Sequence, residues 1–133
     1  MNTTAPKQTP AQGLHQLRQQ SLRMLFNFAE STRTLAAHQW IDPAKRSRAA
    51  NLVSYIKRDL EAYKQRLERL VHKTDNLPGK VIAHPHHPEL LQLGGDYLTF
   101  VDDATAVIAP LIAELTELMY DDADAHSKQA AAI

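Results

Sequence analysis

Apolar residues recur at helical spacing along most of the chain. The clearest run steps alternately by four and three residues. It consists of Ala49, Val53, Ile56, Leu60, Tyr63, Leu67 and Leu70. Such a seam is typical of a helix that packs nearly parallel to another helix. Asp42 and Pro43 precede it as an N-cap and a first-turn proline, so we expect a helix over residues 43–74.

The same spacing predicts one helix before this segment and one after it. Thr9-Pro10 is a helix-start signal, and the apolar residues that follow predict a helix over residues 10–39. They are Leu14, Leu17, Met24, Phe28 and Leu35, with a second stripe of Leu22, Leu25, Ala29 and Ala36 beside them. A later seam predicts a helix over residues 89–121. Its members are Leu90, Gly94, Tyr97, Val101, Ala104, Ile108, Leu111, Leu115 and Leu118.

Proline and glycine residues divide the helices and predict local irregularities. Pro78-Gly79 is typical of a type II turn. Residues 81–88 include two prolines, which exclude a regular helix there. In the last helix, Gly94-Gly95 weakens the first turns, so the helix begins either near residue 89 or at Asp96. Pro110 lacks a backbone donor and is expected to kink this helix.

Together these elements predict an all-α fold. We expect a three-helix bundle with coiled-coil-like packing, formed by a long antiparallel helical hairpin and a third, Pro-kinked helix. Residues 9–121 would form the bundle. Residues 1–8 would be a disordered arm, and the polar, then small residues 122–133 a flexible tail. The third helix is apolar over more than a narrow seam, so either both other helices or a second chain packs on it.

Composition excludes several classes of function. The 133-residue chain has no cysteine, which excludes a disulfide scaffold, a thiolate metal site and a cysteine nucleophile. Its longest strongly apolar stretch, Ala104 to Ala113, has ten residues, and a membrane-spanning helix needs about 20. P-loop, G-x-G-x-x-G and H-E-x-x-H motifs are absent. We therefore expect a cytoplasmic protein that is not an enzyme, uses no cofactor and does not enter a membrane.

The continuous seams favour helix–helix recognition as the function. We expect a protein–protein interaction or assembly module that binds another protein or associates with itself into an oligomer. The broad apolar stripe of the third helix is the candidate partner interface. Its residues are Leu98, Phe100, Val107, Ile112 and Met119.

Charge is segregated along the chain although the total is zero. Residues 1–80 hold 14 Lys and Arg against 6 Asp and Glu, whereas residues 81–133 hold Lys128 against 9 acids. Candidate anion-binding residues lie on the basic helix 43–74, where cations near the N-terminus oppose the helix dipole. They are Lys45, Arg46, Arg48, Arg58, Arg66 and Arg69. The alternative function is therefore a small nucleic-acid-associated protein, although acids such as Glu61 and Glu68 interrupt the basic array.

Histidines form a candidate metal site. His84, His86 and His87 lie in the segment VIAHPHHPEL between the last two helices. In an antiparallel hairpin, His15 and His72 would lie at the same end. Imidazole nitrogens are good ligands for zinc or nickel. The other interpretation is a proline-rigidified surface loop with solvated imidazoles, and on that interpretation no metal is bound.

Two Arg–His pairs suggest a third functional alternative. Arg66-x5-His72 and Arg33-x4-His38 resemble the Arg-x4–6-His signature of the HEPN ribonucleases. This resemblance implies an all-helical protein whose Arg–His pair cleaves RNA across a dimer. It covers only these residues, and it departs from the family at Leu67, because a polar residue usually follows the arginine there.

Overall fold

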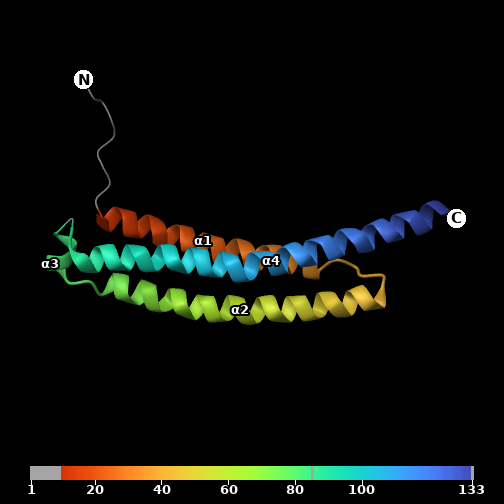
Figure 1. The fold of residues 1–133 in the computed structure, drawn as a ribbon, viewed down its shortest axis with the longest axis horizontal. Helices are drawn as coiled ribbons and strands as arrows, with labels where there is room; N and C mark the ends of the chain where they lie inside the picture. The colour runs from red at the N-terminus through yellow and green to blue at the C-terminus, as the bar shows by residue number, and fades with distance from the viewer. Residues whose placement is uncertain (1–9, 85, 133) are drawn as a thin grey trace, which may run out of the picture.

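The computed structural model describes residues 10–84 and 86–132 and is all-α over that part of the chain. Its elements are α1 (Pro10–Ala36), α2 (Pro43–Asp75), α3 (Gly79–Ile82) and α4 (Pro88–Ala132). Figure 1 shows that α1 and α2 run antiparallel and that α4 runs antiparallel to α2. The three long helices contact one another pairwise, and the short α3 contacts α4. The predicted all-α bundle is confirmed.

The start of α2 follows the local sequence signals. Asp42 has extended backbone angles (φ −78°, ψ 120°), and its carboxylate accepts a hydrogen bond of 3.0 Å from the Ala44 backbone N–H. Pro43 occupies the first turn, where a missing N–H costs nothing. At the other end, the Asn76 backbone N–H donates to the His72 carbonyl. Sequence and structure therefore agree closely on the bounds of this helix.

Buried residues fall into two clusters along the bundle, and most of them belong to the predicted seams. The cluster near α3 contains Leu14, Leu67, Leu70, Val81, Leu90, Leu93, Tyr97 and Phe100. The cluster near the α1–α2 connection contains Leu35, Ala49, Leu52, Ile56, Ala104, Ile108 and Leu115. Ser21 is also buried on the seam of α1, and its hydroxyl is satisfied by donating to the Leu17 carbonyl at 2.8 Å.

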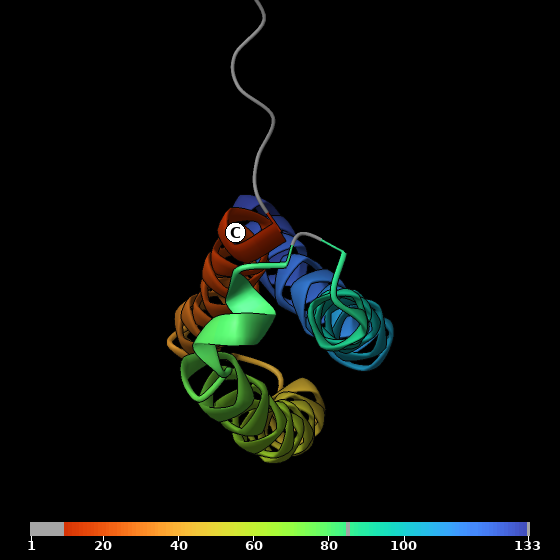
Figure 2. The same ribbon diagram turned by 90° about the vertical axis from the view of Figure 1, so that its left-hand side faces the viewer.

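Helix α4 packs against both other long helices, which explains its broad apolar stripe. Figure 2 shows α1 and α2 side by side, with α4 against them. The helix passes through Gly94-Gly95 without interruption and begins at Pro88, so the alternative start at Asp96 is wrong. Pro110 lies inside it, and Figure 1 shows that its axis changes direction along its length.

Two sequence predictions about local structure are wrong. Helix α1 ends at Ala36, three residues before the predicted end. The type II turn at Pro78-Gly79 is absent, because Gly79 does not adopt the positive φ that this turn requires. Instead Gly79 begins α3, a single helical turn that the prolines nearby had concealed.

The largest correction concerns the predicted tail 122–133. Helix α4 continues to Ala132, since the small residues near its end favour helix and Asp122 is buried against the α1–α2 connection. The predicted arm, residues 1–8, lies outside the described part of the chain.

Candidate protein-binding groove

The strongest candidate site is a surface groove between α1 and α2. Two hollows of about 420 and 440 Å³ adjoin one another along these helices. Leu25 of α1 and Lys64 of α2 line both hollows, so the two form one continuous groove. The floor of this groove is apolar and includes Leu60 and Leu67 of α2, whereas its rim is charged.

Two large apolar side chains of α1 stand at the groove in contact with solvent. Phe26 is 63% exposed and lines the first hollow, and Leu22 is 43% exposed and lines the second. They are four residues apart and therefore project from the same side of α1. Exposed aromatic and aliphatic side chains grouped beside a groove mark surfaces at which proteins associate.

Charged side chains of α2 form the opposite rim of the groove. Lys57, Glu61, Lys64 and Glu68 step by four, three and four residues, so they lie on one stripe of the helix with alternating sign. All four are exposed and line the hollows. Within the described residues none of the four has an ion-pair partner, although Glu61 accepts a long hydrogen bond of 3.4 Å from Gln65. We call these four residues the charge stripe.

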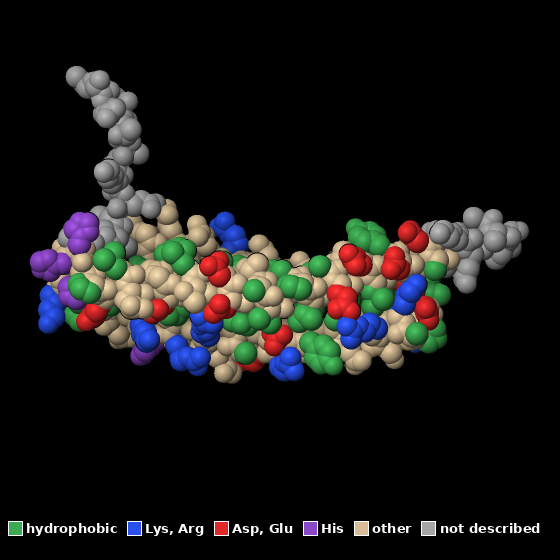
Figure 3. Space-filling view, viewed as in Figure 1, with side chains coloured by type: hydrophobic (Ala, Val, Ile, Leu, Met, Phe, Trp, Pro, Cys, Tyr) green, Lys and Arg blue, Asp and Glu red, His purple; other side chains and the backbone are tan. Residues whose placement is uncertain are grey.

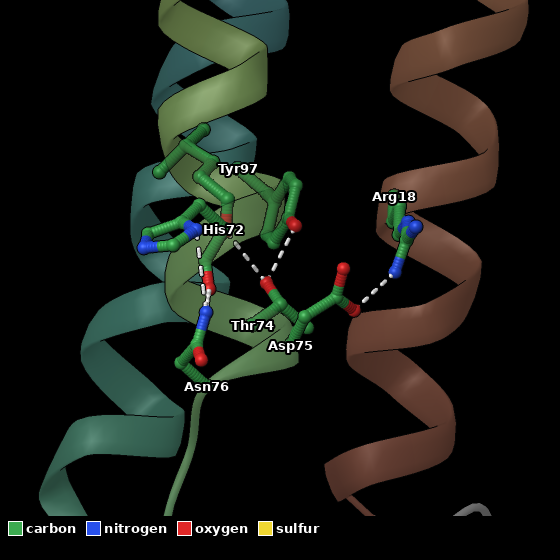
Figure 4. Close-up of polar contacts among 7 residues, drawn as sticks. Arg18, His72, Thr74, Asp75, Asn76 and Tyr97 are labelled. Carbon is green, nitrogen blue, oxygen red and sulfur yellow. Dashed lines mark hydrogen bonds and ion pairs between the residues drawn. The ribbon is translucent and has the colours of Figure 1, made fainter.

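A polar network closes one end of the groove (Figure 4). Arg18 of α1 pairs with Asp75 at the end of α2, with 2.7 Å between Nη1 and Oδ1. Beside it, the hydroxyls of Thr74 and Tyr97 are 2.6 Å apart and join α2 to α4. Tyr97 is fully buried, and its burial raises the pKa of the phenol above 10.0. These contacts fix the spacing of α1 and α2 at this end.

The predicted partner interface on α4 does not form one surface. Leu98 is 55% exposed and Val107 is 40% exposed, but they are nine residues apart, about two and a half turns, and project from opposite sides of the helix. Phe100 has no exposed surface and belongs to the core. Ile112 and Met119 are partly buried and pack against the second core cluster. Phe100, Ile112 and Met119 are thus engaged in the core, because α1 and α2 already cover this part of the stripe.

Two of the predicted anion-binding arginines form ion pairs with α4. Arg48 Nε lies 3.0 Å from the Glu114 carboxylate, and Arg66 Nη1 lies 2.9 Å from the Asp103 carboxylate. The Arg66 guanidinium also lies 5.8 Å from the centre of the Phe100 ring. Opposite charges in the two halves of the sequence thus attract each other within the bundle.

The remaining predicted anion-binding residues are not arranged as one array. Arg58 lies 5.4 Å from the centre of the Tyr55 ring and 3.4 Å from the Asp59 carboxylate. Arg46 donates to the Trp40 carbonyl at 3.2 Å, and this hydrogen bond joins the start of α2 to the connection between α1 and α2. Lys45 is partly buried, whereas Arg69 is exposed.

Histidines gather at the end of the molecule that carries α3 (Figure 3). His84, His86 and His87 line one hollow together with Lys80, whose positive charge disfavours a cation there. The His87 Nδ1 accepts a hydrogen bond from the Glu89 backbone N–H at 3.2 Å. Among the side chains that the structure describes, no group of three His, Asp or Glu is arranged to hold a metal ion. The geometry therefore gives the metal hypothesis no support.

The members of each Arg–His pair have different partners. Arg66 pairs with Asp103, whereas His72 lies at the end of α2 near Asn76. Arg33 pairs with Glu30 on its own helix. His38, its counterpart, pairs with a carboxylate of α4. The two pairs are thus used in contacts within the bundle.

Sequence reasoning missed Leu22 and Phe26 as site residues. The spacing of Leu22, Leu25 and Ala29 did indicate a second apolar stripe beside the seam of α1. Whether that stripe is covered depends on where α4 packs, which periodicity within one helix does not reveal.

Comparison of the chain with protein-family models, with curated proteins and with solved structures found no match. None of the described helices is long and apolar enough to cross a membrane.

Proposed function

We propose that this protein is a helical interaction module that binds a second protein chain in the groove between α1 and α2. The observation that carries the proposal is the exposure of Phe26 at 63%, beside Leu22 and above the apolar floor of the groove. Partner helices packed over this groove would bury these side chains.

The charged rim supports the same function. A polar rim around apolar side chains is the usual anatomy of a protein–protein interface. Here Lys57 and Lys64 alternate with Glu61 and Glu68 along the groove, so a partner with the complementary order of charges would be favoured in one register. A nucleic-acid partner is less favoured, because Arg48 and Arg66 are already paired with acids of α4.

Photo-crosslinking at the groove tests the proposal. Phe26 is replaced by benzoylphenylalanine in the cells that make this protein, and the same residue replaces Leu91 in a matched control. Leu91 of α4 is 60% exposed and lines neither hollow of the groove. We expect one discrete crosslinked product from position 26 and none of that mass from position 91.

A second substitution identifies products that depend on the groove. Leu22→Asp places a charge beside the crosslinker and leaves the core clusters intact, so the product should disappear while the chain stays helical. Equal crosslinking at positions 26 and 91, or a product that Leu22→Asp does not reduce, would contradict the proposed function.

A further inference from the structure

We infer that the partner in the α1–α2 groove is a second copy of this chain, related to the first by a two-fold axis. This inference rests on the proposed function and names the partner. In the arrangement that we infer, the axis lies in the interface and runs perpendicular to the helices. Each of α1 and α2 then packs antiparallel against its own copy, as an isologous interface requires.

The charge stripe is complementary to itself in this arrangement. Lys57 and Glu68 lie 5.5 residues on either side of the midpoint between Ala62 and Tyr63, and Glu61 and Lys64 lie 1.5 residues on either side of it. An axis at this midpoint places Lys57 opposite Glu68 of the second copy. It also places Glu61 opposite Lys64 of the second copy. All four residues of each chain thus meet an opposite charge, and the two-fold symmetry forms four ion pairs.

A parallel arrangement in register has the opposite result. Each residue of the charge stripe would then face its own copy, so that Lys57 and Lys64 oppose lysines and Glu61 and Glu68 oppose glutamates. Like charges in contact destabilise an interface. The order of signs along α2 therefore selects the antiparallel dimer.

The apolar side chains of α1 are centred at nearly the same level of the bundle. Leu22 and Phe26 lie two residues on either side of Met24, so an axis near Met24 brings each of them to the other in the second copy. Leu25, next to Met24, borders the same two hollows as Lys64, next to the midpoint of the charge stripe. A single two-fold axis can therefore pass both α1 near Met24 and α2 at the midpoint of the charge stripe. A two-fold dimer requires that both helices share one axis in this way.

Self-complementarity is tested with two charge-reversed chains. Lys57→Glu with Lys64→Glu makes the stripe wholly acidic, and Glu61→Lys with Glu68→Lys makes it wholly basic. All four positions are exposed, so the fold should survive, and circular dichroism checks the helix content. Native mass spectrometry and sedimentation equilibrium then measure the mass of each variant alone and of an equimolar mixture.

We expect the wild-type chain to form a dimer, each variant alone to be a monomer, and the mixture to form a heterodimer. Arg69→Glu with Lys73→Glu is the matched control, since it reverses two exposed cations of α2 that lie outside the charge stripe. This control should remain a dimer. The control changes the net charge as much as the acidic stripe variant does. If the control is a dimer and the stripe variant is a monomer, net charge alone does not explain the loss of the dimer.

Other outcomes would overturn the inference in distinguishable ways. A monomeric wild-type chain excludes the second copy, and a crosslink from position 26 to a different protein would still support the proposed function. If both stripe variants remain dimers, the dimer interface lies on another surface and the inference is wrong. Loss of both homodimers without a heterodimer in the mixture would show that the two charge stripes do not face each other, and would overturn the inference.

Discussion

The Asp122 carboxylate lies 2.9 Å from His38 Nε2, across 84 residues of sequence. The same carboxylate accepts backbone hydrogen bonds from the N–H groups of Asp42, at 3.0 Å, and Ile41, at 3.1 Å. One buried side chain of α4 thus satisfies the donors of the connection between α1 and α2. It fixes the start of α2 relative to α4.

This arrangement predicts a pH-dependent stability. The hydrogen bond from the Asp42 N–H, with contributions from His38 and Ile41, lowers the pKa of Asp122 from 3.8 to about 2. The folded chain therefore holds this proton less tightly than the unfolded chain. The stability that ionised Asp122 contributes is present above pH 3.8 and is lost as the pH falls to about 2.

Asp122→Asn measures this contribution. We expect the variant to unfold at lower urea concentration than the wild type at neutral pH, and the difference to shrink as the pH falls below 3.8. The measurement is urea unfolding at a series of pH values. If the free energies of unfolding of the two proteins differ by the same amount at every pH down to 2, Asp122 does not cause the loss of stability in acid.

Phe100 and Leu98 are expected to differ sharply in their effect on stability, although both were predicted as interface residues. Phe100 is fully buried, so Phe100→Ala should lower the free energy of unfolding by about 3–5 kcal/mol. Leu98 is 55% exposed, and Leu98→Ala should change it by no more than about 0.5 kcal/mol. Denaturant unfolding of both variants compares them, and similar losses would contradict the placement of α4.

Tyr97 offers a test of the buried hydrogen bond to Thr74. Tyr97→Phe removes only the phenol oxygen, whereas the Thr74 hydroxyl keeps its bond to the Leu70 carbonyl at 2.8 Å. We expect a loss of about 0.5–1.5 kcal/mol in the free energy of unfolding at neutral pH. A Phe variant as stable as the wild type would show that this bond contributes nothing net.

Gly94 and Gly95 are expected to be sites of stabilising substitutions. Both lie inside α4, neither has a positive φ, and alanine loses less backbone entropy than glycine in a helix. A Cβ at Gly94 would lie 3.8 Å from Leu14 Cδ2, an ordinary contact, and one at Gly95 would meet nothing within 4 Å. Each Gly→Ala change should raise the free energy of unfolding by about 0.5–1 kcal/mol. A lower melting temperature for Gly94→Ala would show that α1 and α4 are closer than the structure has them.

The fold was largely predictable because its helices follow local rules. The seam from Ala49 to Leu70 and the Asp42-Pro43 start need only spacing and capping, and the structure reproduces both. The end of α4 was not predictable in this way. Asp122 is stabilised there by donors about 80 residues away, and a polar residue after a seam otherwise indicates a helix end.

The candidate site was predictable only in part. The apolar breadth of α4 indicated that something covers it, but the sequence left open whether α1 and α2 or a second chain does so. In the structure α1 and α2 both pack on α4, and Leu22 and Phe26 of α1 remain exposed. Which stripe stays uncovered is a property of the packed bundle and of no single helix.

Cysteine labelling in solution tests the central claim, that another copy of the chain covers the α1–α2 groove. The chain has no cysteine, so Ala29→Cys in the groove and Ala113→Cys on α4 each give a unique thiol at an exposed position. If a second copy covers the groove, maleimide labelling of Cys introduced at position 29 slows as protein concentration rises, while labelling at position 113 stays constant. Equal rates at both positions over the whole concentration range would contradict it.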